Sequence, residues 1–399
     1  MVLVLLPIHL GEPRLKGHET VVYRDPTLYE GRHKLKIAFL EAIMAASGLP
    51  LVDTIPKGCM FYDPLDCDTL DRFRARTKEP PMELKRMFIL RESHLNHLWS
   101  KDKGKKQVQH RTFFSYAKKV FGIFENVPSQ DMLNRKRLPR DHVAAVRPKS
   151  RDLLGIKQKV IAYVNREFAK NPGSCEELMN LPITRKAALA HMKHFMDHHL
   201  THFGPYEDAM HTTDPFVHHM HCSFLLNVGL LYPKDVLDAV RARTDVPLNS
   251  REGLVRQVLG WREYMRYIYH FHGAKLQRGL FTGTYQDYKN PLPSFKGILP
   301  LEIEMKKIEQ WAWSHHIVRL MVFLNFFHRR KVKLVDMYNF FMRFIALDAY
   351  SWVMVSNLAA MGRFTVKGVP YFMRKRYVTG AAYLLQMSNY PRGKWCEEW

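Results

Sequence analysis

Residues 203–231 read FGPYEDAMHTTDPFVHHMHCSFLLNVGLL, and this stretch decides how the rest of the chain is interpreted. An aromatic-Gly turn with two carboxylates is followed by a His-rich turn, and then by an apolar segment that only Ser223 and Asn227 interrupt. On a helix these two residues lie on one face and can reach one ligand. A Ser that opens a helix also offers its hydroxyl and free backbone N–H groups to a phosphate. The alternative is a buried helix whose Ser and Asn side chains bond only to the backbone.

Three segments further along place polar residues in similar apolar surroundings. They read RQVLGWREY (256–264), SHHIVRLM (314–321) and LDAYSWVMVSN (347–357). With residues 203–231, and in this order, they resemble the flavin-binding half of the photolyase/cryptochrome family. The branch they resemble is that of the prokaryotic (6-4) photolyases, also called iron–sulfur bacterial cryptochromes and photolyases. The resemblance runs over about residues 20–399 and is strongest from residue 180 onward.

The resemblance implies a cavity that holds FAD beside a slot for a base extruded from DNA. His315 and His316 match the histidine pair of the (6-4) branch, in which a histidine beside the lesion donates a proton, so they are the predicted catalytic residues. On a regular helix His316, Arg319, Leu320 and Phe323 share one face, so His316 and Arg319 can address the same cavity. The predicted cofactor-binding residues are Phe203, Tyr206, His219, Ser223, Leu226, Asn227, Gln257, Trp261, Arg319, Asp348, Tyr350 and Asn357.

The RQVLGWREY segment resembles the WREY element of the family. Trp261 is expected to stack on an extruded base, an interaction worth about 1–3 kcal/mol. Arg262 and Glu263 are expected to form an ion pair that braces the helix. A large aromatic residue that only fills a helical core is the alternative for Trp261.

Composition limits the partners and the compartment. The 399 residues include 61 Lys and Arg against 38 Asp and Glu, a formal net charge of +23. This excess favours a polyanionic partner, with nucleic acid, most simply DNA, ahead of a membrane, because no apolar run approaches 20 residues. The five cysteines lack a pairing pattern, which is typical of free thiols in a reducing intracellular compartment.

The expected fold is an α/β N-terminal domain, a reduced Rossmann-like antenna domain, followed by an all-α FAD-binding domain. Apolar runs at residues 2–6 and 20–23 predict buried strands, and the apolar spacing between Arg32 and Ala46 predicts an amphipathic helix. The predicted domains are 1–130 (antenna-like), 131–180 (a basic interdomain linker) and 181–399 (helical). The Gly-Asp-Gln turn that the family has after its first strand is missing, and this argues against an antenna chromophore.

Basic residues gather in two regions. Residues 101–160 hold 16 Lys and Arg against 5 Asp and Glu, and residues 361–394 hold seven basic residues and no acid. Phosphate contact is one interpretation, and a solvated linker is the other. The predicted nucleic-acid-binding residues are Lys105, Lys106, Arg374, Lys375 and Arg376.

The departures from the family pattern concern redox chemistry. Only Cys396 follows the Met-Ser-Asn-Tyr turn at 387–390, whereas the iron–sulfur branch has a CxxC there. A four-iron cluster needs four thiolates, so we expect no iron–sulfur cluster and no metal. Met354 stands where the family presents a carboxylate or amide to the flavin N5, and a thioether cannot donate a hydrogen bond. Phe341 and Met342 replace the Trp and Tyr residues that pass electrons.

Two functions therefore remain open. The first is light-driven repair of UV photoproducts of the (6-4) type, which would make the protein a carbon–carbon lyase. The second is a photolyase-derived, non-catalytic protein that binds nucleic acid or serves as a scaffold in a larger assembly. The intact FGxxxDAM and HH motifs favour the first function, whereas the redox departures favour the second.

Overall fold

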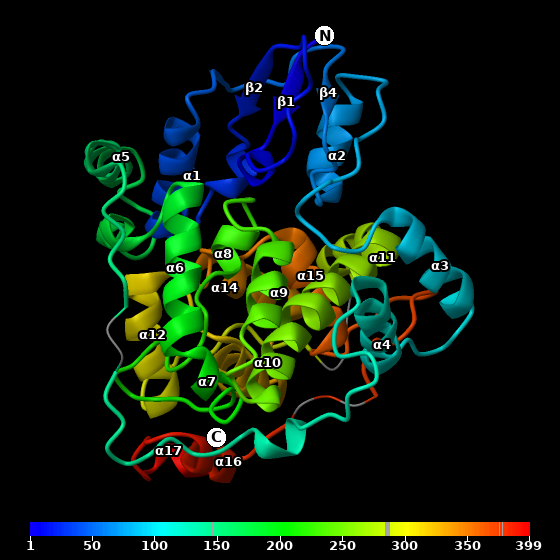
Figure 1. Cartoon of the computed structure of the whole chain (residues 1–399). Coiled ribbons are helices and arrows are strands. Elements are labelled where there is room, and N and C mark those ends of the chain that lie inside the picture. Colours follow the sequence, from blue (N-terminus) through cyan, green and yellow to red (C-terminus); the bar gives the residue numbers. More distant parts are fainter. Residues whose placement is uncertain (145–146, 284–287, 375, 377) are drawn as a thin grey trace.

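The computed structural model describes residues 1–144, 147–283, 288–374, 376 and 378–399. A small α/β unit lies at one end of the molecule, and a larger helical body lies below it with the C-terminus at its far end (Figure 1). This arrangement confirms the predicted combination of an α/β domain and a helical domain. No helix within the described ranges combines the length and apolar character that crossing a bilayer requires.

Four short parallel strands form the sheet of the α/β unit, in the order β3-β2-β1-β4. The register pairs Val4 of β1 with Val21 of β2 and with Phe61 of β4, so buried residues of neighbouring strands lie side by side. The predicted strands at residues 2–6 and 20–23 are confirmed. The strands are β1 (Leu3–Leu5), β2 (Thr20–Tyr23), β3 (Leu51–Val52) and β4 (Met60–Phe61).

The helix predicted between Arg32 and Ala46 is α1, which covers Lys34–Ser47. The His33 ring caps its start, since Nδ1 accepts a hydrogen bond from the Leu35 N–H at 3.1 Å. The other elements of the first 180 residues are η1 (Pro7–His9), η2 (Pro26–Leu28), α2 (Cys67–Arg74), α3 (Glu92–Asp102), α4 (His110–Phe121), η3 (Asp131–Leu133), α5 (Leu154–Glu167) and η4 (Glu176–Asn180). Of these, α5 packs on α1, and α4 packs on η5 and α11 of the helical body.

The helical body continues from residue 181 to the C-terminus. Its elements are α6 (Arg185–His198), α7 (Leu200–Phe203), α8 (Ser223–Leu226), α9 (Pro233–Ala242), α10 (Leu248–Val255), η5 (Arg256–Arg262), α11 (Glu263–Thr282), α12 (Leu299–Trp311), η6 (Val318–Leu324), α13 (Asn325–Arg329), α14 (Leu334–Arg343), α15 (Ser351–Ala360), α16 (Ala381–Met387) and α17 (Trp395–Glu398). The apolar segment after Ser223 is thus mostly a turn, because helix covers only its first four residues.

Buried contacts hold the α/β unit against the helical body. Gly11 lies against Gly229, where a Cβ on Gly11 would come within 2.3 Å of the Gly229 carbonyl oxygen. Lys36 of α1 is buried and donates to the Leu347 carbonyl at 3.0 Å. Glu263 accepts from the Ile89 and Leu90 N–H groups at 2.9 and 3.2 Å. The predicted pairing of Glu263 with Arg262 is therefore wrong, since the carboxylate faces a backbone turn that it satisfies.

Candidate functional site

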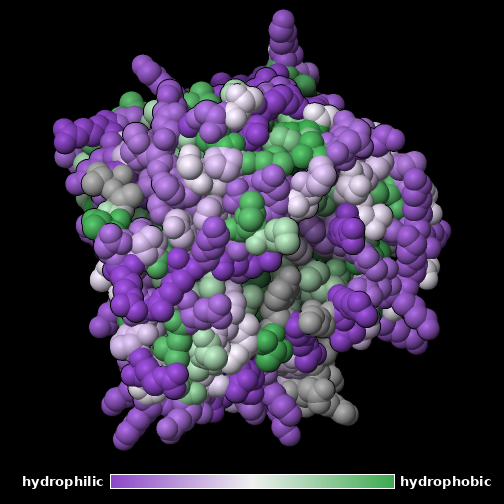
Figure 2. Space-filling view, turned by 60° about the horizontal axis from the view of Figure 1, so that its bottom comes forward, coloured by the Kyte–Doolittle hydropathy of each residue, from purple (hydrophilic) through white to green (hydrophobic). Residues whose placement is uncertain are grey.

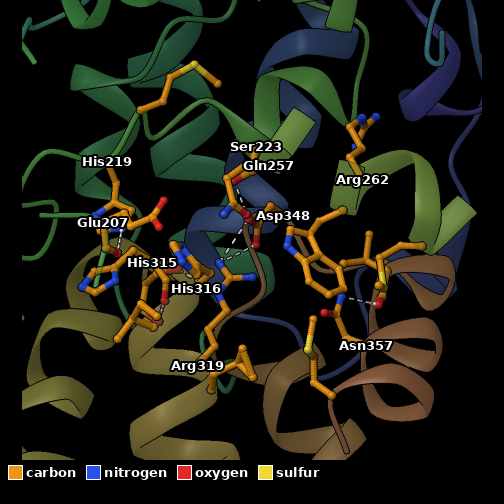
Figure 3. A pocket seen from close by; sticks show the side chains of 18 of the residues that line it. Glu207, His219, Ser223, Gln257, Arg262, His315, His316, Arg319, Asp348 and Asn357 are labelled. Carbon is orange, nitrogen blue, oxygen red and sulfur yellow. Dashed lines mark hydrogen bonds and ion pairs between the residues drawn. The ribbon is translucent and has the colours of Figure 1, made fainter. Parts of the chain in front are cut away.

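A cavity of about 800 Å³ lies in the helical body. Its walls come from residues 203–227, from η5, from the segment that leads into η6, and from α15 (Figure 3). Figure 2 looks toward the underside of the molecule, where a hollow among hydrophilic residues exposes apolar side chains. Sequence-predicted residues in the lining are Phe203, His219, Ser223, Leu226, Asn227, Gln257, Trp261, His315, His316, Arg319, Asp348 and Asn357.

Asp348 is the centre of a hydrogen-bond cluster on the cavity wall. Its carboxylate accepts from both Arg319 Nη2, at 2.9 and 3.1 Å, and the Ser223 hydroxyl. Asn227 Nδ2 donates to the Asp348 carbonyl at 2.9 Å, and Trp313 Nε1 donates to the Ser223 oxygen at 3.1 Å. Ser223 and Asn227 thus meet one partner, as their spacing predicts, but that partner is a carboxylate of the protein. A phosphate would be repelled by Asp348 at this point.

Arg262 supports the same wall from behind. Its guanidinium donates to the Asn227 side-chain oxygen and, at 3.2 Å, to the Leu226 carbonyl. It also lies 5.0 Å from the ring centroids of both Phe88 and Trp352. Burial lowers the pKa of Arg262 to about 10, so it keeps its charge at neutral pH. An arginine between two aromatic faces holds Asn227 in a fixed orientation.

Three imidazoles form what we call the histidine wall: His219, His315 and His316. The rings of His219 and His315 stack with centroids 4.1 Å apart and planes 14° apart, and His316 meets His219 edge-on at 5.3 Å. Both ring nitrogens of His219 lie 3.0 Å from carbonyl oxygens, those of Phe216 and Glu207. Burial nevertheless lowers the pKa of His219 to about 3 and that of His316, beside Arg319, to about 4. Burial also holds the pKa of His315 well below its usual range, so all three rings are neutral at pH 7.

Glu207 adds a carboxyl group to this wall that the sequence interpretation missed as a site residue. Burial, and then the neighbouring Asp208 carboxylate, raise the pKa of Glu207 to about 7. The sequence signal was present, because two adjacent carboxylates precede the His-rich turn. Other lining residues that were missed are Arg135, Arg256 and Trp313.

The opposite side of the cavity is what we call the apolar wall: Phe341, Trp352, Met354, Leu358 and Met361. Among the residues of α15 that line the cavity, Asn357 carries an amide, and its Nδ2 already donates to the Val353 carbonyl at 2.8 Å. Met354 is buried. This wall offers van der Waals contact and few hydrogen bonds to a ligand.

Two of the wall-forming helices depart from α-helical geometry at the cavity. Residues 256–262 and 318–324 are π-helical, so their side chains repeat about every 4.4 rather than 3.6 residues. His316, Arg319 and Leu320 of the predicted face all line the cavity, and only Phe323 does not, because the π-helical turn shifts the positions beyond Leu320. Phe323 is buried away from the cavity, and Met321 and Leu324 join Arg319 in the lining.

Two predicted cofactor residues lie outside the cavity lining. Tyr206 packs on Leu138 and its neighbours. Tyr350 is buried beneath the ammonium group of Lys36, which lies 3.5 Å from the ring centroid. The tyrosine ring therefore helps to hold the turn that presents Asp348, and it does not face the cavity.

The two basic segments lie next to each other. Tyr371 N–H donates to the Lys106 carbonyl at 3.0 Å, and Val108 N–H donates to the Tyr371 carbonyl at 2.9 Å, so Lys105 and Lys106 neighbour the segment that carries Arg374 and Arg376. Lys105 pairs with Asp102 at 2.8 Å. Lys375 lies outside the described residues.

The cysteines bear on the cluster prediction. All five are free thiols, and four of them are buried. Within the described ranges, no three His, Cys, Asp or Glu side chains are grouped so that they could hold a metal ion. The absence of an iron–sulfur cluster stays a prediction for iron analysis.

Comparison with known proteins connects these features to a family. Over 241 residues the chain is 34% identical to a (6-4) photolyase of Agrobacterium fabrum, a match that covers 59% of this chain and 46% of the relative. The chain thus spans less than half the length of that protein. Over 114 residues it is 32% identical to the uncharacterized protein R853 of Acanthamoeba polyphaga mimivirus, which covers 27% of this chain and 87% of the relative. No protein-family model matches the sequence.

Two solved structures share the fold. A bacterial class III photolyase from Agrobacterium tumefaciens superposes with a TM-score of 0.56 at 16% identity, covering 89% of this chain and 78% of the other. A Synechocystis cryptochrome superposes with the same TM-score at 14% identity, covering 97% of this chain and 88% of the other. At these identities the superpositions establish the shared fold.

Proposed function

The chain belongs to the photolyase/cryptochrome family, and from that membership we propose that its cavity binds FAD and that the protein repairs UV photoproducts in DNA under light, with (6-4) lesions as substrate. The observation that carries the proposal is the joint placement of residues from four distant segments around one cavity. The (6-4) specificity rests on the histidine pair and on the partial match to a (6-4) photolyase.

The residues of the cavity fit a flavin dinucleotide. A volume of about 800 Å³ lies within the range of small-molecule sites. Two polar groups that line it, the Gln257 amide and the His316 imidazole, are partly exposed and have no hydrogen-bond partner among the described residues, so they can bond to a ligand. The same cavity is lined by Trp261, Trp313 and Trp352, so a planar ligand would contact aromatic side chains there.

The charges of the lining also suit this ligand. Four arginines line the cavity, and a diphosphate is attracted to their combined field, away from the Asp348 carboxylate. Gln257 and Asn357 can donate to and accept from heterocycle edges. When bound, FAD would supply the light-absorbing electron donor. The chain itself binds and orients the ligand, excludes water and holds protons.

The decisive experiment uses the whole purified protein. We expect flavin absorption bands near one FAD per chain, or their recovery after incubation with FAD. Chemically reduced, flavin-loaded protein should then restore an oligonucleotide with a (6-4) lesion under blue light, because external reductant supplies the electrons that Phe341 and Met342 cannot pass. Protein that binds neither FAD nor the lesion would contradict the proposal.

A non-catalytic nucleic-acid-binding protein is the second candidate function, and the apolar wall favours it. Met354 places a buried thioether where the family presents a polar group to the flavin, and Phe341 is nearby in the same lining. Flavin-loaded, reduced protein that binds the lesion and repairs none of it would favour this function.

DNA binding is common to both candidates and rests on charge. Reversing the exposed Arg374 and Arg376 together should weaken binding to damaged and undamaged duplexes alike, because phosphate contacts carry no sequence information. Binding should also fall with salt, with a log–log slope of about −0.9 per phosphate neutralised. A binding constant that does not change with salt would point to a protein partner instead.

A further inference from the structure

The Glu207 carboxyl group is buried with almost no compensation. The residue is 5% exposed, and its carboxyl points into the cavity beside the imidazoles of the histidine wall (Figure 3). One long hydrogen bond reaches it, from Asn134 Nδ2 to Oε1 at 3.4 Å. A buried carboxylate is normally held by a cation or by several donors.

The cations around Glu207 are committed to other acids. Arg256 bonds to Asp131 and, at 3.1 Å, to Glu252, and Arg135 bonds to Asp131 at 2.8 Å and faces Asp208 at 3.6 Å. Asp208 itself accepts from the Tyr383 hydroxyl at 3.0 Å. Among the described residues, no Lys, Arg or His side chain lies within ion-pair distance of the Glu207 carboxylate. The arrangement therefore favours the neutral, protonated form.

The imidazoles nearby cannot take over this proton. His219 stacks on His315, and both lie next to His316, so a charge on one ring would meet two other buried rings and no carboxylate partner. Arg319 stands close to His316 and opposes its protonation. His219 is moreover tied to the Glu207 backbone carbonyl, which fixes the carboxyl-bearing residue against the stacked rings.

We propose that Glu207 holds the exchangeable proton of the cavity at neutral pH and donates it to a substrate bound beside His315 and His316. The inference rests on the proposed repair function. In this step the O–H bond of Glu207 breaks and a bond forms between that proton and a nitrogen or oxygen of the substrate. Glu207 is left as a carboxylate in the field of Arg256 and Arg135, and water returns the proton after product release. No electron moves in the step.

Infrared titration of the purified protein tests whether the proton is present. We expect the carbonyl band of a protonated carboxyl to titrate with a midpoint near pH 7 and to be missing from Glu207→Gln. Asp208→Asn should move the midpoint to lower pH, since it removes a neighbouring negative charge. A midpoint below about 5, the ordinary range of a glutamate, would overturn the proposal.

Single-turnover repair by reduced, flavin-loaded protein tests whether the proton is used. The wild-type rate should fall as pH rises through about 7. Glu207→Gln should abolish this fall of the rate with pH and lower the rate by about 10²–10⁴-fold. Its FAD and DNA dissociation constants should stay within twofold of wild type. Glu304→Gln, which changes a buried carboxyl outside the cavity, should keep the fall of the rate above pH 7.

The possible outcomes separate the inference from the function on which it rests. Repair by Glu207→Gln with a wild-type rate and pH profile would overturn the inference and leave the repair function standing. Flavin-loaded wild-type protein that repairs nothing would remove the repair function. In that case the infrared titration alone tests whether Glu207 holds the proton. A midpoint near pH 7 would support this assignment, and a midpoint below pH 5 would overturn it.

Discussion

The histidine wall and the apolar wall of the cavity differ in how much chemistry they retain. The first combines three imidazoles, a carboxyl with a pKa of about 7 and the neighbouring Arg319–Asp348 pair. The second presents Met354, Phe341 and other apolar side chains across the same space. In Figure 3 the labelled polar residues of the histidine wall lie together on one side, and Asn357 lies on the other.

This difference follows from how the side chains of each wall are held. The hydrogen-bond cluster around Asp348 spans residues from three distant segments, so removing any one member leaves buried groups without partners. Apolar residues at Met354 and Phe341 leave no buried polar group without a partner, because their side chains pack without hydrogen bonds. Substitutions in the apolar wall should therefore disturb the cavity less than substitutions in the Asp348 cluster, and the following variants address the two walls in turn.

The largest effect is expected from Asp348→Ala. The change leaves the half-buried Arg319 without its carboxylate, and breaking such a pair costs about 3–5 kcal/mol of the free energy of unfolding. It also releases Ser223, so we expect loss of bound flavin. Denaturant unfolding and the flavin absorption of purified protein measure the two effects.

The surface variant Asp141→Ala is the matched control for Asp348→Ala and should change both quantities little. Asp348→Ala protein that keeps stoichiometric flavin would contradict the central place of this carboxylate. It would also show that the apolar wall alone suffices to hold the ligand.

A smaller effect is expected from Met354→Glu, which brings a carboxylate to the apolar wall. Without ligand, the buried acid should lower the free energy of unfolding by about 2–3 kcal/mol, whereas Met354→Leu should cost less than about 1.5 kcal/mol. With flavin bound, the same carboxylate restores a polar neighbour and should raise light-driven repair. Equal repair rates for Met354→Glu, Met354→Leu and wild type would show that the wall does not limit the chemistry.

The sequence predicted most of the fold and ten of the twelve cofactor residues as members of one cavity lining, because four motifs with fixed order constrain one another. The periodicity of apolar residues predicted α1 and the first two strands, because a helix or strand that is buried on one or both faces has a regular apolar pattern. The placement of these residues in the lining is a property of the fold.

The features that the sequence did not predict depend on irregular backbone geometry and on residues that are distant in the chain. The π-helical segments change which side chains face the cavity, and no composition signal marks them. Tyr350 lies two residues from Asp348 yet faces Lys36 from the other end of the chain. Glu207 owes its high pKa to burial and to Asp208, and burial is known only from the folded structure.

The pH dependence of stability should reveal the histidine wall through His316. The pKa of His316 is lowered from 6.5 to about 4 in the folded state, so the unfolded chain binds the proton first as pH falls. Its contribution is fully present above pH 6.5 and is lost toward pH 4, about 1–3 kcal/mol in all. His316→Gln should flatten this part of the stability curve in urea unfolding, compared with wild type. An unchanged slope in His316→Gln would mean that its ring is solvated.

The smallest effect is expected from Tyr350→Phe, and it separates the structure from the sequence interpretation. As a flavin ligand, Tyr350 would lose a hydrogen bond on this change, and FAD would bind more weakly by about tenfold. In the structure its hydroxyl is buried and has no partner among the described residues, and the ring alone contacts the Lys36 ammonium. Removing the hydroxyl should therefore leave the FAD dissociation constant within twofold and the free energy of unfolding within about 0.5 kcal/mol of wild type, or raise it. Tyr383→Phe is the matched control, because its hydroxyl donates to Asp208 at 3.0 Å and its loss should cost about 1–3 kcal/mol. Fluorescence titration with FAD and denaturant unfolding measure both variants, and a tenfold loss of FAD affinity in Tyr350→Phe would place this tyrosine back in the binding site.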